Sequence, residues 1–474
     1  MIHTLLVVSL GAALLEPAQT LDAAALAREH ETRRFANVPA PCLNPDLLAT
    51  EIDRLATAHP GQIQVETIGT SFHDRKIRLI SVGRGPKTIL LWSQMHGDEP
   101  SATPALLDLT DYLARESARP EIRKILDAFT LRMIPMLNPD GALAYERRNA
   151  QGIDVNRDAL MLTTPEGVLL KSVRDRFSPI LGFNLHDQGR RITVGETGVL
   201  SSISLLAVSG DAEGTLTPGR MRAKRVASHI AATLSPFIPG GIARYDEDWN
   251  PRAFGDNVTA WGTPVVLIES GGFPKGGGFV ELTRLNFVAL IKVLEGLAAN
   301  DLDDVSPNLY DGLLRNKSDG FADVAIVGAS ILEPRSGKWF RADVAFDALS
   351  SDQTTAGCSA TPRTSSRVVE VGDSRVVSAA RKIDGRQIAL ASLSRDRGLR
   401  AGEIQRTALA ALRPDLASPP ADPQAFLGAL RLSERGLTRG GAATFVLWVG
   451  DAARPGGGRF FVVIDGVGLP PTLD

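Results

Sequence analysis

The sequence TILLWSQMHGDE, residues 88–99, runs from an apolar segment into a histidine and a carboxylate. Residues 88–92 have the continuous apolar side chains that are typical of a buried strand. His96 and Glu99 follow in a His-x-x-Glu spacing. Imidazole nitrogen and carboxylate oxygen are both ligands of Zn²⁺, and a catalytic zinc commonly has three protein ligands and one open position. The pair is common by chance, so a metal site requires a third ligand from elsewhere in the chain.

Short apolar runs alternate with longer helical patterns between residues 21 and 299. The helical patterns have their apolar side chains on one face, whereas the short runs are strand-like. This alternation predicts an α/β domain with a mostly parallel, buried sheet. The predicted strands are 63–68, 77–82, 88–92, 129–136, 180–185 and 264–268, and the predicted helices are 21–37, 47–58, 102–113, 221–234 and 282–299.

Three candidate site residues follow predicted strands: His96, His186 and Glu269. In sheets of this kind, ligands bind beyond the carboxyl ends of the strands. We therefore expect these side chains to converge, although they are far apart in the sequence. The only two cysteines, Cys42 and Cys358, cannot form a Cys-x-x-Cys site, so histidines and carboxylates must hold any metal.

The length and composition indicate two domains. The 474 residues exceed one ordinary core, and a first domain is expected over 45–300. After a polar, linker-like stretch at 301–307, short β-branched runs separated by Gly, Ser and Asp predict a smaller β-rich domain over 301–474, with one helix at 423–435. The formal net charge of −2 and the lack of basic blocks argue against a nucleic-acid partner.

Residues 1–44 form an N-terminal extension with two open interpretations. The apolar run 5–15 has the length of a signal-peptide core and is too short to span a bilayer. It is either part of a signal peptide within residues 1–20, for a periplasmic or secreted protein, or a helix that packs on the domain of a cytoplasmic one. No later segment is long and apolar enough for a transmembrane helix.

Six motifs occur in series in the first domain: His96-Gly-Asp-Glu99, Asn138-Pro-Asp-Gly141, Arg147-Arg148-Asn149, Gly152-Ile-Asp-Val-Asn-Arg157, Asn184-Leu-His186 and Ile268-Glu269. Together they resemble the zinc carboxypeptidases of the carboxypeptidase A type, over about residues 45–297. The resemblance implies a single α/β domain with an eight-stranded mixed sheet and one Zn²⁺ per chain.

The resemblance also implies roles for the residues near the metal. His96, Glu99 and His186 would bind Zn²⁺ and leave one position for water. Glu269 would be the general base that takes a proton from this water and passes it to the leaving amine. Asp154 matches the carboxylate that accepts a hydrogen bond from the first zinc histidine and fixes its tautomer.

Other matched residues would bind the substrate. Asn156 and Arg157 match the pair that holds the terminal carboxylate, since a guanidinium binds a carboxylate through two hydrogen bonds and asparagine adds a donor. Arg147 matches the arginine that polarises the scissile carbonyl and stabilises the oxyanion. Tyr245 is the only tyrosine near the place of the family's mobile active-site tyrosine, and its spacing is loose.

Two acidic residues depart from the best-known members of the family. Asp187 follows the second zinc histidine, where it could tune the site or contact substrate. Asp256 lies where the family builds its pocket for the terminal side chain. A carboxylate there would either favour a basic terminal residue or cap a turn.

The leading hypothesis is a zinc metallocarboxypeptidase that hydrolyses the C-terminal peptide bond of peptides. The alternative is a zinc-dependent N-acyl amino-acid deacylase on a related fold, which shares the His-x-x-Glu and Asn-Arg elements and binds a small carboxylate-bearing substrate. A third hypothesis is a catalytically inactive binding module. The Asn-Pro-Asp-Gly run and the domain size favour the peptidase. The sequence does not indicate an oligomeric state.

Overall fold

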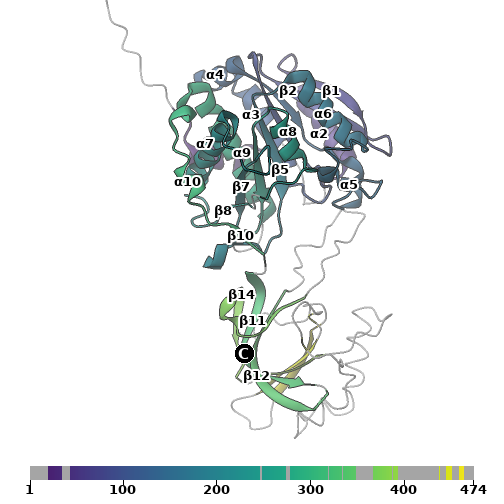
Figure 1. Cartoon of the computed structure of the whole chain (residues 1–474), viewed down its shortest axis with the longest axis vertical. Helices are drawn as coiled ribbons and strands as arrows, with labels where there is room; N and C mark the ends of the chain where they lie inside the picture. The colour runs from purple at the N-terminus through teal and green to yellow at the C-terminus, as the bar shows by residue number, and fades with distance from the viewer. Residues whose placement is uncertain are drawn as a thin grey trace, which may run out of the picture.

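The structure, a computed structural model, describes residues 20–34, 43–245, 248–273, 278–318, 320–333, 335–347, 367–386, 388–392, 437, 443, 445–450 and 458–463. These residues form two bodies (Figure 1). A larger α/β body has an eight-stranded sheet, and a smaller body has a seven-stranded sheet. The predicted fold class, an eight-stranded mixed α/β sheet followed by a β-rich part, is confirmed. No helix among these residues combines the length and the apolarity needed to cross a bilayer.

The sheet of the α/β body consists of β1 (Ile63–Thr70), β2 (Lys76–Val82), β3 (Lys87–Ser93), β4 (Phe129–Ile134), β5 (Leu181–Asp187), β7 (Ile203–Ala207), β8 (Ile242–Arg244) and β9 (Val265–Ser270). Their order is β1-β2-β4-β3-β5-β9-β7-β8. The centre, β4-β3-β5-β9, is parallel, as is the pair β7-β8. The pairings β1-β2, β2-β4 and β9-β7 are antiparallel. The parallel centre brings the carboxyl ends of β3, β5 and β9 to the same end of the sheet.

Helices cover both faces of this sheet. One face carries α6 (Pro165–Phe177) and α8 (Phe254–Ala260), and their core layer includes Leu90 and Trp92 of β3. The alternate residue Leu91 belongs to the opposite layer, as the two-residue period of a strand requires. That layer is covered by α1 (Ala23–Arg33), α2 (Pro45–Ala58), α3 (Ala102–Arg115), α4 (Pro120–Ala128), α7 (Pro218–Leu234) and α9 (Gly278–Ala299).

The predicted strands and helices before residue 300 are confirmed among the described residues, with shifted ends. Sequence patterns missed α4, α6, α8, β7 and β8. Strand β8 has only three residues and α8 has seven, so neither shows a readable period. Helix α6 buries few apolar side chains, but Thr164 caps its start and Pro165 occupies its first turn.

Two predictions were wrong in detail. His186 and Glu269 lie within β5 and β9 rather than after them, because both strands extend beyond their last apolar residue. The stretch predicted as a linker instead forms η3 (Asp301–Asp304) and leads into α10 (Asn308–Asp311). Leu302 and Tyr310 are buried against the α/β body, and the Tyr310 hydroxyl accepts a hydrogen bond from the Ala207 amide (3.0 Å).

The smaller body is built around the long strand β11 (Phe321–Glu333). It also contains β12 (Lys338–Phe346), β13 (Val368–Gly372), β14 (Ser378–Asp384), β15 (Ile388–Ser392), β16 (Phe445–Gly450) and β17 (Gly458–Val463). The order is β13-β12-β11-β15-β16-β17, and β14 pairs in parallel with the first half of β11. Ile326, Phe346 and Leu390 are among its buried core residues. The helix predicted at 423–435 lies outside the described residues.

The segment after β5 joins the two bodies. Strand β6 (Thr193–Val194) pairs with β10 (Asn316–Lys317). Arg191 forms ion pairs with Asp323 and, at 3.0 Å, with Asp347. Gln188 Oε1 accepts a hydrogen bond from Asn316 Nδ2 (3.0 Å). The chain that leaves the His186 strand is therefore held by residues of the β-rich body and by the short strand before it.

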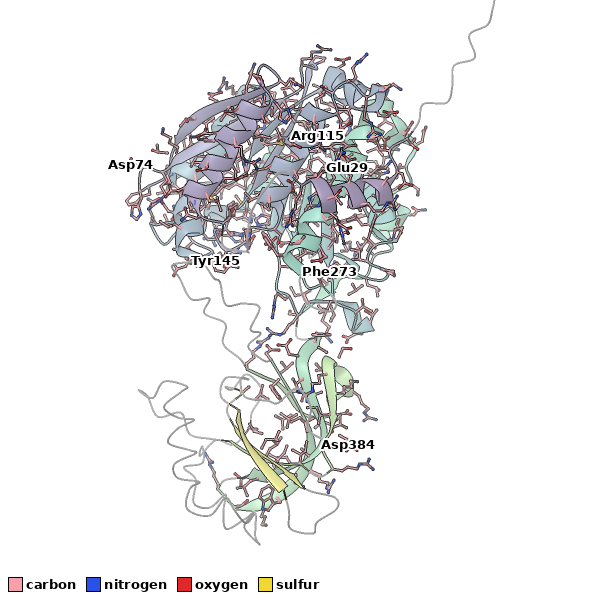
Figure 2. The ribbon with its side chains drawn as sticks, turned by 180° about the vertical axis from the view of Figure 1, so that it is seen from behind. Glu29, Asp74, Arg115, Tyr145, Phe273 and Asp384 are labelled. Carbon is pink, nitrogen blue, oxygen red and sulfur yellow. The ribbon has the colours of Figure 1, made fainter. Side chains whose placement is uncertain are left out.

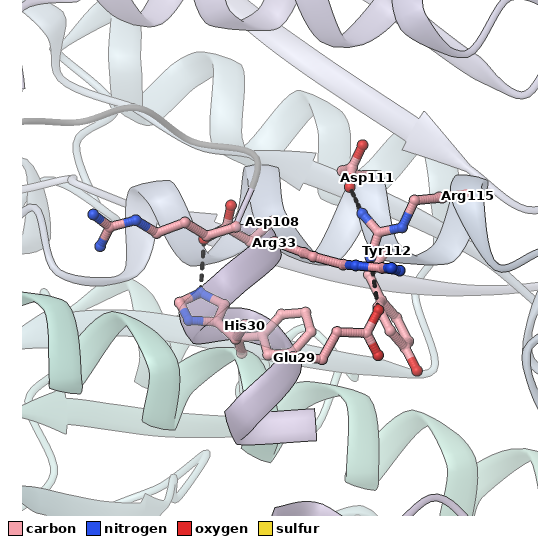
Figure 3. Close-up of a pocket in the computed structure, with 9 residues that line it drawn as sticks. Glu29, His30, Arg33, Asp108, Asp111, Tyr112 and Arg115 are labelled. Carbon is pink, nitrogen blue, oxygen red and sulfur yellow. Dashed lines mark hydrogen bonds and ion pairs between the residues drawn. The ribbon is translucent and has the colours of Figure 1, made fainter. Parts of the chain in front are cut away.

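Helix α1 is fixed on the face of the α/β body shown in Figure 2. His30 Nε2 lies 2.8 Å from Asp108 Oδ2 of α3, and Arg115 of α3 donates to Glu29 (3.1 Å) (Figure 3). His30 also contacts the Phe287 ring of α9, with 4.9 Å between centroids. The predicted helix at 21–37 is thus confirmed over its described part. The predicted signal peptide, Cys42 and Cys358 lie outside the described residues.

Gly97 allows the His-x-x-Glu loop to lie directly against α5 (Pro139–Ala144). A β-carbon on Gly97 would lie 1.9 Å from the carbonyl carbon of Gly141 and 2.2 Å from the amide nitrogen of Ala142. Asn138 Nδ2 donates to the Met95 carbonyl (3.3 Å), and Asn138 Oδ1 accepts from the Gly141 amide (2.8 Å). The predicted turn at 138–141 is therefore the capped start of a helix, and it fixes the backbone from which His96 projects.

We expect Gly97→Ala to destabilise the protein by ~1–3 kcal/mol, because backbone atoms that cannot move aside would meet the new methyl group. Urea denaturation of the metal-free protein measures this difference. Gly189→Ala is the matched control, since the nearest atoms to its β-carbon would be 3.7 Å away. Equal unfolding midpoints for Gly97→Ala and the unaltered protein would contradict the role given to this contact.

Candidate metal centre

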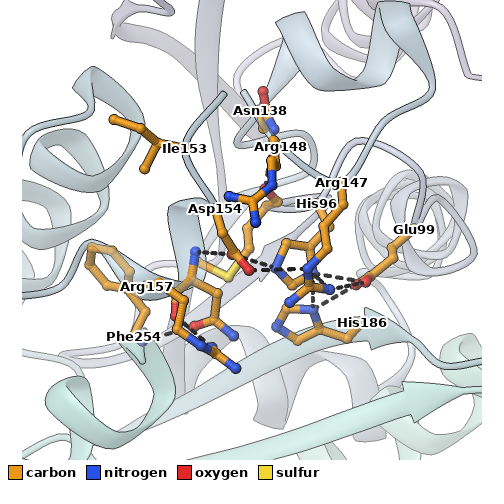
Figure 4. A network of polar contacts seen from close by, with 12 residues as sticks. His96, Glu99, Asn138, Arg147, Arg148, Ile153, Asp154, Arg157, His186 and Phe254 are labelled. Atoms are coloured by element: carbon orange, nitrogen blue, oxygen red, sulfur yellow. Dashed lines mark hydrogen bonds and ion pairs between the residues drawn. The ribbon is translucent and has the colours of Figure 1, made fainter. Parts of the chain in front are cut away.

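His96, Glu99 and His186 meet at the carboxyl ends of β3 and β5 (Figure 4). His96 and Glu99 lie in the loop between β3 and α3, and His186 is in β5. Their ligand atoms all lie within 4.8 Å of one another, and all three side chains are buried. His96 and His186, which the sequence predicts to converge, lie together in the fold.

The spacing of these atoms fits one zinc ion. Nδ1 of His96 and Nδ1 of His186 are 3.2 Å apart, and oxygens of Glu99 lie 2.8 Å and 2.7 Å from them, respectively. Two nitrogens that bind a tetrahedral zinc at about 2.0–2.1 Å lie about 3.3 Å apart. Two imidazoles, one carboxylate and an open position are also a recurring donor set of catalytic zinc.

The ionisation of Glu99 and His186 suits a metal as well. Burial raises the pKa of Glu99, but the nearby His96 and His186 outweigh this effect and hold it well below its usual range. Burial lowers the pKa of His186. An ionised carboxylate and a neutral imidazole are the forms that bind a metal, so little proton release would accompany binding at these two ligands.

Asp154 and Arg147 contact the candidate ligands from the outside. Asp154 Oδ1 lies 3.1 Å from His96 Nε2, so the Nδ1 of that ring faces the other ligands. Asp154 also caps η1 (Val155–Arg157) through the Asn156 amide (3.0 Å). Arg147 donates from Nε to Asp154 (3.1 Å) and from Nη1 to Glu99 (3.1 Å). The guanidinium of Arg147 therefore lies at the edge of the ligand set, where its side chain is 43% exposed.

Glu269 and Tyr245 lie beside the ligands. The register of β5 and β9 sets His186 directly opposite Glu269, which is 6% exposed. Burial, and then the charges of Glu99 and Asp187, raise the pKa of Glu269 well above its usual range. A bound divalent cation would oppose this rise. The charge of Glu269, followed by burial, raises the pKa of Tyr245, which hydrogen-bonds to the Glu269 carboxylate.

Asn156 and Arg157 stand at a separate part of the site. Asn156 Oδ1 accepts from the Phe254 amide (2.9 Å), which leaves the NH₂ group to donate to a ligand. Figure 4 shows Arg157 on the opposite side of Asp154 from His186. Arg157 lines an open pocket of about 470 Å³. A carboxylate bound by Asn156 and Arg157 would thus lie apart from the metal ligands.

Asp187 and Asp256, the two acidic residues that depart from the best-known family members, both accept hydrogen bonds from backbone amides. Asp187 accepts from the Ser101 amide (3.0 Å), and burial raises its pKa to about 8. Asp256 accepts from the Asn250 amide (2.9 Å), and burial raises its pKa to about 6. Of the two interpretations of Asp256, the structure shows the capped turn.

Sequence patterns did not single out Tyr145 or Arg252. Burial, followed by the charges of Asp187 and Asp98, raises the pKa of Tyr145 to about 12. Tyr145 ends α5 in a left-handed conformation with φ of 51°. Arg252 lines the same pocket as Arg157. Both residues lie in turns, where no period or motif marks a side chain that faces a site.

We expect Asp154→Asn to weaken zinc binding by about 10–100-fold, because an amide holds the His96 ring less firmly than a carboxylate. Competition between the protein and a fluorescent zinc chelator measures the affinity. Asp127→Asn is the control, since Asp127 is exposed and pairs only with Arg84 among the described residues. Unchanged zinc affinity in Asp154→Asn would show that Asp154 does not orient this ligand.

Comparisons with known proteins point to one family. Residues 48–164 match the family described as zinc carboxypeptidase. The probable carboxypeptidase 2 of Trichophyton verrucosum is 29% identical over 246 residues, which are 48% of this chain and 47% of that protein. Carboxypeptidase M of Mus musculus is 27% identical over 221 residues, with 41% and 47% covered, respectively. The chain thus spans about half the length of the curated relatives it matches.

Solved structures of the same kind also align with this chain. A metallo-carboxypeptidase from Burkholderia cenocepacia aligns with a TM-score of 0.44 and 17% identity, over 54% of this chain and 69% of that one. The family match spans the His-x-x-Glu pair and Arg157, while His186 and Glu269 lie beyond it in the sequence. Within its α/β body, the chain is thus similar to zinc carboxypeptidases, and residues 48–164 match the model of that family.

Proposed function

We propose that this protein is a zinc-dependent carboxypeptidase that hydrolyses the C-terminal peptide bond of peptides. The observation that carries the proposal is the position of Glu269, which lies opposite His186 and within reach of the charges of Glu99 and Arg147. A general base, a set of metal ligands and a guanidinium are thus gathered around one point. Peptide hydrolysis needs all three kinds of group.

Zinc held by His96, Glu99 and His186 would supply Lewis-acid chemistry, since it polarises a carbonyl and lowers the pKa of a water molecule. Glu269 would take a proton from the attacking water and deliver it to the nitrogen of the leaving amine. Arg147, exposed at the edge of the ligand set, would stabilise the negative charge that develops on the carbonyl oxygen.

The residues away from the metal would give the enzyme its preference for a chain end. Arg157 would hold the terminal carboxylate through two hydrogen bonds, and the Asn156 NH₂ group would add a third. Tyr245, which hydrogen-bonds to Glu269, would contact the substrate between these two regions. A carboxylate fixed apart from the metal would bring the last peptide bond, rather than an internal one, beside Glu269.

We expect the zinc-loaded protein to remove a single residue from free-acid peptides and to leave the same peptides intact when they are C-terminally amidated. Amidation removes the charge that Arg157 would bind. Mass spectrometry of a mixed peptide library, with and without a zinc chelator, measures both requirements. Cleavage of amidated peptides, or cleavage that survives the chelator, would contradict the proposal. Hydrolysis of N-acetyl amino acids without hydrolysis of peptides would favour the deacylase instead.

We expect Glu269→Gln to lower kcat by about 100- to 10,000-fold, because glutamine cannot accept the proton from water. The zinc content should stay at that of the unaltered protein, since Glu269 is not among the three ligands; metal analysis checks this. Glu66→Gln, at an exposed site on β1 that pairs with Arg176, is the control. Full activity in Glu269→Gln would rule out this residue as the base.

A further inference from the structure

The pocket beside Arg157 is rich in positive charge. It has a volume of about 470 Å³ and is lined by Arg148, Gly152, Ile153, Asp154, Arg157 and Arg252. Three of these six residues carry a guanidinium group, and one carries a carboxylate. Carboxylates are the groups that guanidinium forks bind most readily in pairs of hydrogen bonds.

The three arginines have no carboxylate partner at hydrogen-bond distance within the part of the chain that the structure describes. Among the described residues, none of them forms an ion pair within 4.0 Å. Arg148 Nη1 donates to the Gly152 carbonyl (3.1 Å), and Arg157 Nη1 donates to the Asn156 carbonyl (2.8 Å). The backbone of Arg252 is fixed, because its amide donates to Asn250 Oδ1 (3.0 Å) and its carbonyl accepts from the Ala159 amide (3.2 Å).

Asp154, the one carboxylate in the lining of the pocket, already has hydrogen-bond partners on both oxygens. Asp154 binds His96 Nε2 through one oxygen and Arg147 Nε through the other. It therefore does not pair with Arg148 or Arg252, which are both exposed. A concave site with excess charge of one sign attracts ligands of the opposite sign.

We propose that Arg148 and Arg252 bind a second anionic group, so that the preferred substrates are peptides whose C-terminal residue has a carboxylate side chain. The proposal rests on the proposed function, in which Arg157 and Asn156 bind the α-carboxylate. That assignment leaves two guanidinium groups in the same pocket for the side chain of the terminal residue. Aspartate, glutamate and similar dicarboxylic amino acids carry such a group.

Asp256 could instead favour a basic C-terminal residue, but two observations argue against that specificity. A basic terminal side chain would need its carboxylate, but one oxygen of Asp256 already accepts from the Asn250 amide. Asp256 is not in the lining of the pocket, whereas the three arginines are. A lysine side chain in this pocket would meet like charges.

The first experiment compares zinc-loaded protein on peptides that differ only in a C-terminal Glu, Gln or Lys. Gln has the size of Glu without its charge. We expect kcat/KM to be about tenfold higher for the Glu peptide than for the Gln peptide, the size expected of two partly exposed charge pairs. Lys should be the poorest. Equal rates for Glu and Gln, or a preference for Lys that is lost in Asp256→Asn, would overturn the proposal.

The second experiment replaces both arginines, Arg148→Gln and Arg252→Gln, and follows the Glu-to-Gln ratio of kcat/KM. A ratio that falls below about twofold is expected, and a general loss of folded or metal-loaded protein cannot change this ratio. Arg123→Gln on α4 is the matched control, because it removes one exposed positive charge away from the pocket. A double variant that keeps the full ratio would overturn the proposal.

Binding separates this proposal from the proposed function. Calorimetry with Glu269→Gln measures the Kd of the same peptides without turnover, and the Glu peptide should bind about tenfold more tightly than the Gln peptide. Tight, Glu-selective binding together with no cleavage by the unaltered protein would contradict the proposed carboxypeptidase activity and support the side-chain site at Arg148 and Arg252. Cleavage without any preference for Glu would support the activity and contradict the side-chain site.

Discussion

The pairing of β5 with β9 is the constraint on which the site depends. Its register puts His186 directly opposite Glu269 on neighbouring parallel strands. His186 and Glu269 are buried in these strands, so a slip of either strand by one residue would turn its own side chain to the other face of the sheet. The distance between a metal ligand and the proposed base is therefore set by backbone hydrogen bonds rather than by a flexible loop.

The other residues of the candidate site come from loops rather than from strands. His96 and Glu99 come from a loop that lies on α5 at the glycine contact, and Asp154 comes from the turn that starts η1. Each of these residues is fixed by hydrogen bonds or close packing of the backbone as well as by its neighbours in the site. The electrostatics follow from this crowding, because buried carboxylates near one another raise each other's pKa unless a cation lies between them. A metal ion held by His96, Glu99 and His186 would be such a cation.

Much of the fold and of the metal-ligand set could be predicted from the sequence. Apolar runs mark buried strands, and His96, His186 and Glu269 follow or end such runs, so their convergence could be expected. The ends of β5 and β9 could not be placed, because backbone pairing continues through polar residues. The burial of Leu302 and Tyr310 could not be predicted either. A short polar stretch has the same sequence pattern whether it links two domains or packs on the surface of a domain. Arg252 has no motif, and only the fold brings it to the pocket of Arg157.

The ion pairs of Arg191 bear on where one domain stops and the other starts. Arg191 lies shortly after His186 in the chain, and its partners Asp323 and Asp347 belong to the β-rich body. Strand β10, which pairs with β6, leads directly into β11. The contacts between the two bodies thus include segments that lie on both sides of residue 300 in the sequence. A chain that ended at residue 300 would leave β6 without its partner strand and Arg191 without these two carboxylates.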